Sequence, residues 1–326
     1  MPLQEMAKHG HELTIGNNVA EFRRKMEGGP LGVEFTPVLH ADMSQFDIAM
    51  GQRLNAHGAL PIWRRMSATT RTVFEIDDDP FNIEPHNWNA YELYSRADVL
   101  DAVTHFAETA AAVTVTTEPL AEVMRKYNPN VHILPNHVPG FVLDLPAPEG
   151  ERPAVGWAGG ASHGKDIKVI SRPLRQFLDR HPGWDAVLIG TDYRLEVKHM
   201  RCGFIPWVHV THDPEAYYRT IDFDIGLAPL HPSEFARSKS FIKALEYAAR
   251  GIPVIASDME PYRDFVVHGE TGWLARYDHE WLKYLTELAN DDAMRAEMGA
   301  KAKEHARGYT IEQGWKLWEQ VYGGLL

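Results

Sequence analysis

The sequence predicts an α/β protein made of two doubly wound parallel-sheet domains. Short apolar runs alternate with longer helical patterns along the chain, which is typical of α/β layering. The length of 326 residues exceeds one ordinary core and suits two domains of about 150 residues each. Between residues 141 and 153, FVLDLPAPEGERP interrupts the pattern with prolines and acidic residues and reads as an interdomain linker.

In the first half we expect short strands and one long helix over residues 90–110. The strands are expected at HELTIG, VEFTPV, FDIAMG, RTVFEID, AAVTVTT and VHILPNHV. The start, LQEMAKHGHELTIG, predicts a helix, a glycine stop and a strand. A strand normally precedes such a helix, so the first domain either lacks its first strand or the chain begins after a missing segment.

The second half repeats a strand–helix pattern. Strands are expected at AVGWAG, WDAVLIG, FIPWVHV, DFDIGLAPL and PVIASD. Helices are expected at DIKVISRPLRQFLDRH, SKSFIKALEYAARG, HEWLKYLTELAN, DAMRAEMGAKAKEHARG and TIEQGWKLWEQVYG.

Composition narrows the possible functions. Lys plus Arg is 33 and Asp plus Glu is 45, so the formal charge of 33 − 45 = −12 argues against a nucleic-acid surface. The single cysteine, Cys202, fits a reducing compartment. The N-terminus lacks the apolar core of a signal peptide, and no uncharged apolar run approaches ~18 residues. We therefore expect a cytoplasmic protein without a transmembrane segment or a structural zinc.

The stretch VFEIDDDP, residues 73–80, ends an apolar run in three carboxylates. It lies at the carboxyl end of an expected strand, the edge at which open α/β sheets bind ligands. Asp77 and Asp79 have the D-x-D spacing of metal-holding carboxylates in many sugar transferases. The residues alone leave three readings open: a metal site, cleft-facing carboxylates on the acceptor side, or a structural turn.

The stretch RSKSFIKALEYAARGIPVIASD, residues 237–258, predicts a helix that ends at Gly251 before a strand. Ser240 is the expected N-cap. Backbone N–H groups, hydroxyls and the Lys239 ammonium converge there, as in an anion site. An ordinary amphipathic helix with a solvated basic entry explains the same residues.

The stretch VGWAGGASHGKD, residues 155–166, runs from a strand through Gly159 and Gly160 toward a helix. Glycines allow a backbone to approach a ligand closely, and Lys165 can pair with a phosphate. It does not match G-x-G-x-x-G, so a dinucleotide fingerprint is absent. His163 fits a site or an ordinary loop equally well.

Together these stretches resemble the retaining "glycosyl transferases group 1" family, which has the two-Rossmann GT-B fold. The resemblance rests on IDFDIGLAPL, SKSFIKALEYAARGIPVIASDMEPYRDFVVHGETGWL and LTELANDDAMRAEMGAKAKEHA, over about residues 153–323. It implies an N-terminal acceptor-side domain over 1–145, a donor domain over 146–308, and a C-terminal helix over 309–326 that crosses back to the first domain. The two domains would face a cleft.

The resemblance also implies roles for the donor residues. Glu246 matches the glutamate that binds the ribose hydroxyls of the nucleotide. Gly159, with Gly160 beside it, matches the glycine that faces the donor diphosphate, and Lys165 falls near the basic residue that neutralises it. The backbone of Ser240 and Phe241 would meet the phosphates.

Two further positions complete the implied site. The stretch from Trp207 to Val210 falls where the base-binding loop lies, mostly through its backbone. The sequence departs from the family at Ser238, because many members carry a glutamate there that faces the transferred sugar. Lys239 follows this position and is our catalytic candidate on the donor side.

On the acceptor side, Asp77 and Asp78 take the place of a strand-tip histidine and are candidate catalytic residues. The resemblance implies metal-independent, retaining transfer of a sugar from a nucleotide diphosphate sugar to a glycan, lipid or protein hydroxyl, with no cofactor. A sugar-nucleotide epimerase or hydrolase of the same fold, or a non-catalytic nucleotide-sugar binding protein, is the alternative. In the last helix, Trp315, Trp318 and Tyr322 form one stripe, which we expect to contact residues below about 150.

Overall fold

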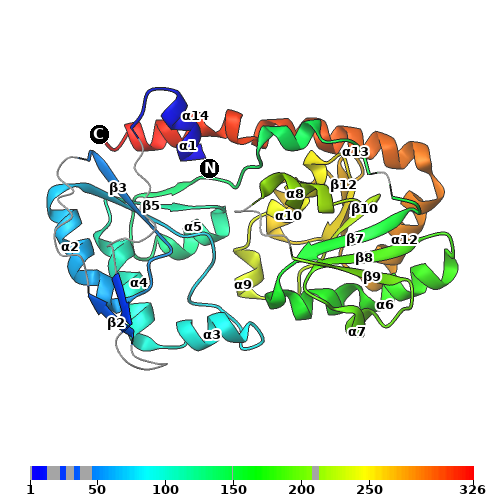
Figure 1. Ribbon diagram of the computed structural model, residues 1–326, viewed down its shortest axis with the longest axis horizontal. Helices are drawn as coiled ribbons and strands as arrows, with labels where there is room; N and C mark the ends of the chain where they lie inside the picture. The colour runs from blue at the N-terminus through cyan, green and yellow to red at the C-terminus, as the bar shows by residue number, and fades with distance from the viewer. Residues whose placement is uncertain (1, 13–22, 27–32, 37–45, 149, 208–212) are drawn as a thin grey trace. The chain divides into compact units, whose positions relative to one another are not determined.

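The computed structural model describes the chain except residues 1, 13–22, 27–32, 37–45, 149 and 208–212. The described chain divides into two compact units (Figure 1). The N-terminal unit comprises Leu3–Ile83, Glu92–Pro135 and Lys316–Leu326. The C-terminal unit comprises Met1–Pro2, Glu84–Tyr91 and Asn136–Trp315. The chain therefore passes between the units at several points rather than through one linker.

The N-terminal unit is built on a four-stranded parallel sheet in the order β3-β4-β5-β6. Its strands are β3 (Ile48–Gln52), β4 (Arg71–Glu75), β5 (Ala112–Val115) and β6 (Val131–Ile133). Its helices are α2 (Leu60–Thr69), α4 (Ala97–Thr109) and α5 (Glu118–Met124), with the 3₁₀ turn η1 (His57–Ala59). Trp63, Phe74 and Phe106 fill the core between the sheet and these helices, at ring distances of 5.4–6.5 Å.

The strand expected at VEFTPV is present, but it lies outside the parallel sheet. VEFTPV gives β2 (Val33–Thr36), which pairs antiparallel with β1 (Arg23–Met26) outside the parallel sheet. The short connection between them suits an antiparallel pair, because a parallel pair needs a crossover of about a dozen residues or more. The strand expected at HELTIG extends into residues outside the described part of the chain.

The helix expected over 90–110 is two helices, α3 (Trp88–Tyr94) and α4. The break falls at Arg96, whose backbone is extended (φ −82°, ψ 129°). The Ser95 hydroxyl donates to the carbonyl of Glu92, and the Arg96 guanidinium pairs with Asp98 at 2.7 Å. These local hydrogen bonds compete with a continuous helix.

The C-terminal unit is built on a six-stranded parallel sheet in the order β12-β11-β10-β7-β8-β9. Its strands are β7 (Ala154–Gly159), β8 (Asp185–Gly190), β9 (Cys202–Pro206), β10 (Ile225–Ala228), β11 (Val254–Ser257) and β12 (Gly272–Ala275). Its helices are α6 (Gly164–Arg180), α7 (Arg194–Val197), α8 (Pro214–Thr220), α9 (Glu234–Arg237), α10 (Ile242–Ala249), α11 (Glu260–Arg263), α12 (Asp278–Asn290) and α13 (Asp292–Ala306). Its 3₁₀ turns are η2 (Gly140–Asp144), η3 (Ala161–His163) and η4 (Arg307–Tyr309).

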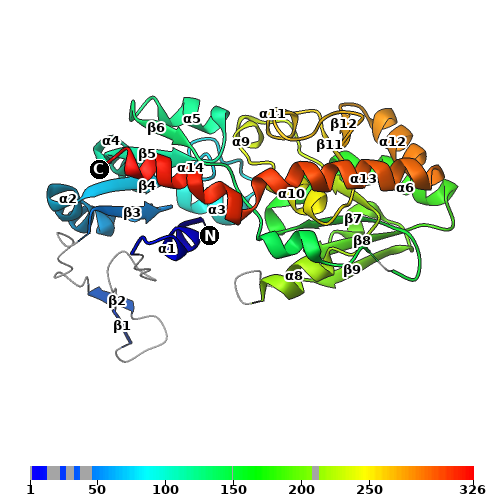
Figure 2. The same ribbon diagram turned by 90° about the horizontal axis from the view of Figure 1, so that it is seen from above.

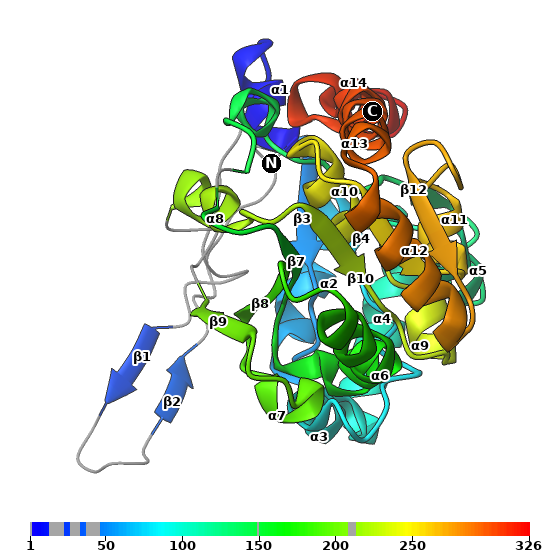
Figure 3. The same cartoon turned by 90° about the vertical axis from the view of Figure 1, so that its right-hand side faces the viewer.

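Helices cover both faces of this sheet. On one face α6 and α12 pack against each other (Figure 3), and their apolar side chains share a core with Val155 and Trp157 of β7. On the other face α10 packs against α13 (Figure 2) and shares a core with Ala158 and Phe223. This two-layered burial explains why the strands read as continuous apolar runs.

The expected linker is part of the C-terminal core. Val142, Leu143 and Leu145 are buried there, and the Arg250 guanidinium donates to the carbonyl of Pro146 at 2.6 Å. The prolines and acidic residues gave the segment the composition of a linker, but its three apolar residues decide its packing.

The last helix, α14 (Ile311–Gly323), contributes residues to both units. Tyr322 is buried against Val73 and Leu134 in the N-terminal unit, with Trp318 packed beside it. The Tyr322 hydroxyl lies 3.0 Å from the sulfur of Met50. Trp318 and Tyr322 thus contact residues below 150, as predicted, and the contacts expected for Trp315 stay a prediction.

The short helix α1 (Pro2–Lys8) lies beside α14 (Figure 1), with Leu3 in the same apolar cluster as Tyr322. Near α1, Nε2 of His11 lies 3.0 Å from a carboxylate oxygen of Glu319 in α14. The start of the chain therefore belongs to the packing around the last helix. Among the described residues, no helix is long and apolar enough to cross a membrane.

Candidate active site

The strand order of the C-terminal unit defines where a ligand can bind. From β7 the chain continues to β8 and β9 on one side and returns to β10 on the other. Open α/β sheets bind ligands outside the carboxyl ends of the strands at this reversal point. The carboxyl ends of β7 and β10, at Gly159 and Ala228, therefore mark the candidate site.

Gly159 and Gly160 stand at that edge in different surroundings. A side chain on Gly159 would place its Cβ 2.4 Å from the Trp157 ring and 3.1 Å from the Lys243 ammonium. A Cβ added to Gly160 would have no atom of the described residues within 4 Å. Gly159 is thus required by close packing, and Gly160 leaves open space above the backbone.

A hydrogen-bond network fixes the loop after β7. Asp166 is buried, and its carboxylate accepts from the backbone N–H of His231 at 2.7 Å. Its other oxygen lies 2.6 Å from Nδ1 of His163, so that nitrogen carries the hydrogen. Burial lowers the pKa of His163 to about 4, which leaves the ring neutral at pH 7. Asp166 thereby joins the loops that follow β7 and β10.

Helix α10 presents two ionisable groups to the same edge. The Lys243 ammonium donates to the carbonyl of Ala158 and lies 5.0 Å from the centre of the Trp157 ring. Glu246 lies one turn further along α10 and accepts a hydrogen bond of 3.0 Å from the Tyr217 hydroxyl. Lys243 therefore meets the end of β7, and Glu246 lies beside it on the same face of α10.

Burial perturbs both groups in opposite directions. It raises the pKa of Glu246 and lowers the pKa of Lys243, while the opposite charge of each partner works against both shifts. The Tyr217 hydroxyl further favours the ionised form of Glu246. Perturbed ionisable groups that cluster at a ligand-binding edge are typical of functional sites.

The two lysines predicted to bind phosphate have separate partners. The Lys165 ammonium pairs with Glu84 at 2.8 Å. Lys239 lies over the Phe235 ring at 4.7 Å, and its charge contributes to lowering the pKa values of Lys243 and His163. Lys239 is thus electrostatically coupled to the edge at Gly159, whereas Lys165 is held by a carboxylate.

The start of α10 differs by one residue from the expectation. The N-cap is Phe241 rather than Ser240, a shift within the usual uncertainty of helix ends. The Ser240 hydroxyl accepts from the Asn136 amide at 2.8 Å. The Phe241 side chain is buried and stacks on Phe265 at 4.9 Å, so its side chain serves the core.

The expected base-binding stretch is described only in part. Val210 lies outside the described residues. The Trp207 ring lies 5.6 Å from that of Tyr217, and a Cβ on Gly190 would approach it to 2.3 Å. Trp207 therefore packs closely over the carboxyl end of β8.

The acidic stretch of the N-terminal unit holds three carboxylates in different surroundings. Asp77 receives a two-pronged ion pair from Arg53, and Asp78 lies 3.9 Å from the same guanidinium. Asp79 is buried and accepts from the backbone of Phe81 at 2.9 Å and from the Asn82 amide at 2.8 Å. Asp79 therefore stabilises a turn, while Asp77 and Asp78 lie at the carboxyl end of β4.

Arg53 has a left-handed backbone (φ 50°), which is uncommon for a residue other than glycine. Burial of Glu75, close to Asp77, raises its pKa to about 7. Strained backbone beside perturbed carboxylates is common at ligand sites. In the described part of the chain, no group of three His, Cys, Asp or Glu residues could hold a metal ion.

Comparison with known proteins finds a family match over the second half of the chain. Residues 147–305 match the family described as Glycosyl transferases group 1. We call these matched residues, just under half of the chain, the group 1 domain. The match covers the edge formed by Gly159, Lys243 and Glu246.

Curated relatives carry the name D-inositol 3-phosphate glycosyltransferase. The protein of Corynebacterium diphtheriae is 25% identical over 65% of this chain and 55% of its own length. That of Corynebacterium glutamicum is 26% identical over 74% of this chain and 61% of its own length. This chain thus spans less than two thirds of the length of these relatives.

Solved structures share the fold. HepE of Anabaena, in complex with UDP and glucose, matches with a TM-score of 0.64 and 15% identity over 86% of this chain and 79% of its own. Sucrose-phosphate synthase from Thermosynechococcus elongatus matches with a TM-score of 0.61 and 16% identity over 86% and 74%. The chain has the two-domain, Rossmann-like GT-B fold, as the sequence predicted.

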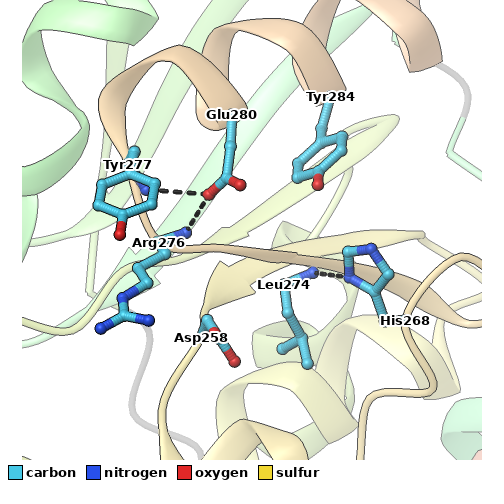
Figure 4. A pocket seen from close by; sticks show the side chains of 7 residues that line it. All are labelled: Asp258, His268, Leu274, Arg276, Tyr277, Glu280 and Tyr284. Atoms are coloured by element: carbon cyan, nitrogen blue, oxygen red, sulfur yellow. Dashed lines mark hydrogen bonds between the residues drawn. The ribbon is translucent and has the colours of Figure 1, made fainter.

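The group 1 domain also contains a surface pocket of about 440 Å³ beside β12 and α12 (Figure 4). Glu280 accepts from the backbone N–H groups of Arg276 and Tyr277 at 2.7 and 3.0 Å, and Nδ1 of His268 accepts from that of Leu274 at 3.0 Å. These polar groups support the local fold at the sheet margin. The residues that line the pocket are different from those at the carboxyl ends of β7 and β10.

Sequence reasoning missed three residues that contact the candidate site, namely Lys243, Tyr217 and Asn136. Lys243 lies three residues before Glu246 on α10, a spacing that places both on one helix face and could have found Lys243. Tyr217 and Asn136 gave no local signal, because only the tertiary fold brings them to Glu246 and Ser240.

Proposed function

We propose that this chain is a retaining, metal-independent glycosyltransferase that transfers a sugar from a nucleotide diphosphate sugar to an acceptor hydroxyl. The observation that carries the proposal is the partly buried Lys243–Glu246 pair beside Gly159, at the reversal point of a group 1 domain sheet. Glu246 binds the ribose hydroxyls, and Gly159 and Gly160 face the diphosphate.

The proposed site meets the main chemical demand, stabilising charge on the leaving diphosphate. Lys243 and Lys239 supply positive charge at the end of β7, and Lys165 supplies it from the first turn of α6. Burial strengthens such interactions because the local dielectric is low. A bound diphosphate would also offset the burial cost of the Lys243 ammonium.

The proposed transfer needs no dedicated protein base. The bond between the anomeric carbon and the phosphate oxygen breaks, and the acceptor oxygen forms the new bond on the same face. The proton of the acceptor hydroxyl passes to the departing phosphate oxygen. The diphosphate leaves as the nucleoside diphosphate, so atoms and charge balance without a metal.

Asp77 and Asp78 are proposed to bind the acceptor. Their place at the carboxyl end of β4 and their shared Arg53 suit hydrogen bonding to a polyhydroxylated molecule. Asp79 is left out of this role because its oxygens are used in a turn.

The test is incubation with radiolabelled UDP-, GDP- and ADP-sugars, with D-inositol 3-phosphate among the acceptors because the curated relatives carry its name. Transfer of label to an acceptor, with the anomeric configuration kept, supports the proposal. Turnover without an acceptor would identify a hydrolase or epimerase instead. Binding without turnover would identify a non-catalytic protein.

A further inference from the structure

A short segment from the first half of the sequence belongs to the C-terminal unit. Glu84–Tyr91 leaves the N-terminal unit after Ile83 and lies with the group 1 domain. Its first residue, Glu84, accepts a hydrogen bond from the Lys165 ammonium at 2.8 Å, 81 positions away in sequence. The segment therefore contributes a carboxylate to the edge at which we place the donor.

Glu84 bridges the two loops that flank the reversal point. Lys165 lies in the first turn of α6, which follows β7, and Ser233, in the loop after β10, also hydrogen-bonds to Glu84. The side chains of Lys165 and Glu84 are 37% and 26% exposed, so solvent or a ligand can reach the pair. This pair is accessible enough to exchange partners.

Glu84 is ionised at neutral pH. Burial raises its pKa, but hydrogen bonds from Lys165 and Ser233 outweigh burial and lower the pKa overall. His86 lies 3.9 Å from Glu84, and burial together with the charge of Lys165 lowers the pKa of His86. A neutral His86 leaves the Lys165 ammonium as the cation in hydrogen-bond contact with Glu84.

A carboxylate and a phosphate both present anionic oxygens that can accept hydrogen bonds from the same ammonium. We propose that Glu84 is an internal competitor of the donor diphosphate, which holds Lys165 until a nucleoside diphosphate group displaces it. The inference rests on the function proposed above. It makes Glu84 a residue that sets donor affinity without contacting the nucleoside.

The competition predicts a specific pattern of binding. Glu84→Gln removes the competing charge, so Lys165 becomes available to the diphosphate. Because a partly exposed ion pair contributes only modestly, the dissociation constant for the nucleoside diphosphate should fall by roughly two- to five-fold. A nucleoside without phosphates does not meet Lys165, so its binding should not change.

The experiment is isothermal titration of wild type, Glu84→Gln, Lys165→Gln and the double variant with UDP, GDP and ADP and with the matching nucleosides. Glu297→Gln is the matched control, because it removes an exposed carboxylate paired with Lys301 at 2.6 Å on α13. The expected result is tighter nucleoside diphosphate binding in Glu84→Gln alone, with nucleoside binding unchanged. In the Lys165→Gln background, the Glu84 substitution should have no further effect.

Other results overturn the inference. Unchanged or weaker diphosphate binding by Glu84→Gln would mean that Glu84 is irrelevant or positions Lys165 for the donor. A gain that persists without Lys165, or that extends equally to the nucleoside, would mean that the effect is not competition for Lys165. If no variant and no wild type binds any of the three nucleotides, the proposed function itself fails, and the inference fails with it.

Discussion

The substitution Glu246→Gln gives the sharpest test of the donor site. Glutamine has the shape of glutamate and keeps an oxygen that can accept from the Tyr217 hydroxyl, which lies 3.0 Å from Glu246. Alanine would leave the buried hydroxyl of Tyr217 without this partner, at a cost of about 1–3 kcal/mol. Glutamine therefore separates the loss of charge from the loss of packing.

The expected magnitude follows from the hydrogen bonds that Glu246 would make to the ribose. Hydrogen bonds to a charged group contribute about 1.5–3 kcal/mol, and about 1.4 kcal/mol corresponds to a tenfold change in affinity. The dissociation constant for the bound nucleoside diphosphate should rise about 10- to 150-fold. Loss of the Glu246 charge also removes the anion that favours the charged form of Lys243.

The assay is isothermal titration with the nucleoside diphosphate that binds wild type most tightly, together with thermal unfolding of both proteins. The free nucleoside should lose as much affinity as the diphosphate, because the missing contact is to the ribose. Glu297→Gln serves again as the control for removal of a carboxylate. An unchanged dissociation constant in a folded Glu246→Gln protein would refute our placement of the ribose.

Four further predictions concern stability and metal. Gly159→Ala should destabilise the fold by about 1–3 kcal/mol, because its Cβ would lie 2.4 Å from the Trp157 ring; Gly160→Ala, in open space, is the thermal-unfolding control. The pKa of Glu75 is raised to about 7 by burial, so the fold favours its protonated form and loses stability as pH rises through 7. Urea unfolding should show Glu75→Gln equal to wild type near pH 4 and more stable above pH 7, by up to about 3 kcal/mol; parallel pH profiles would contradict this. EDTA should leave sugar transfer largely intact. If EDTA abolished transfer and manganese or magnesium restored it, the D-x-D stretch would be a metal site. Deleting residues 316–326 should lower transfer activity and expose the apolar cluster around Tyr322, measured by dye binding, while nucleotide titration still detects the donor site.

The parallel sheets were predictable because buried strands read as apolar runs, and β7, β8, β10 and β11 fall where AVGWAG, WDAVLIG, DFDIGLAPL and PVIASD were expected. The end of the helix at Gly251 was also predictable. Gly251 has a left-handed backbone (φ 74°), a conformation that glycine tolerates. Local sequence patterns gave a wrong prediction where tertiary contacts determine the structure. The composition of residues 141–145 suggested a linker, but this segment packs into the core of the C-terminal unit.

In the candidate site, too, local sequence motifs identify some residues and only tertiary contacts bring in the others. Gly159 lies at the end of one strand, Lys239 lies just before α10, and Glu246 lies on α10, so two short linear motifs identify them. Glu84 and Tyr217 reach the same edge from distant segments, and their contacts to Lys165 and Glu246 span 81 and 29 positions. No periodicity over a short window carries that information.

The division of α14 between the units has a consequence for how the chain folds as it leaves the ribosome. Val73 and Leu134 are translated before the C-terminal unit, but Trp318 and Tyr322, which pack against them, are translated only after it. The N-terminal unit therefore cannot finish its core until the whole C-terminal unit has been synthesised. During that interval an apolar surface stays uncovered on the nascent chain, which makes it a natural substrate for chaperones. A premature stop codon upstream of Trp318 would make that exposure permanent.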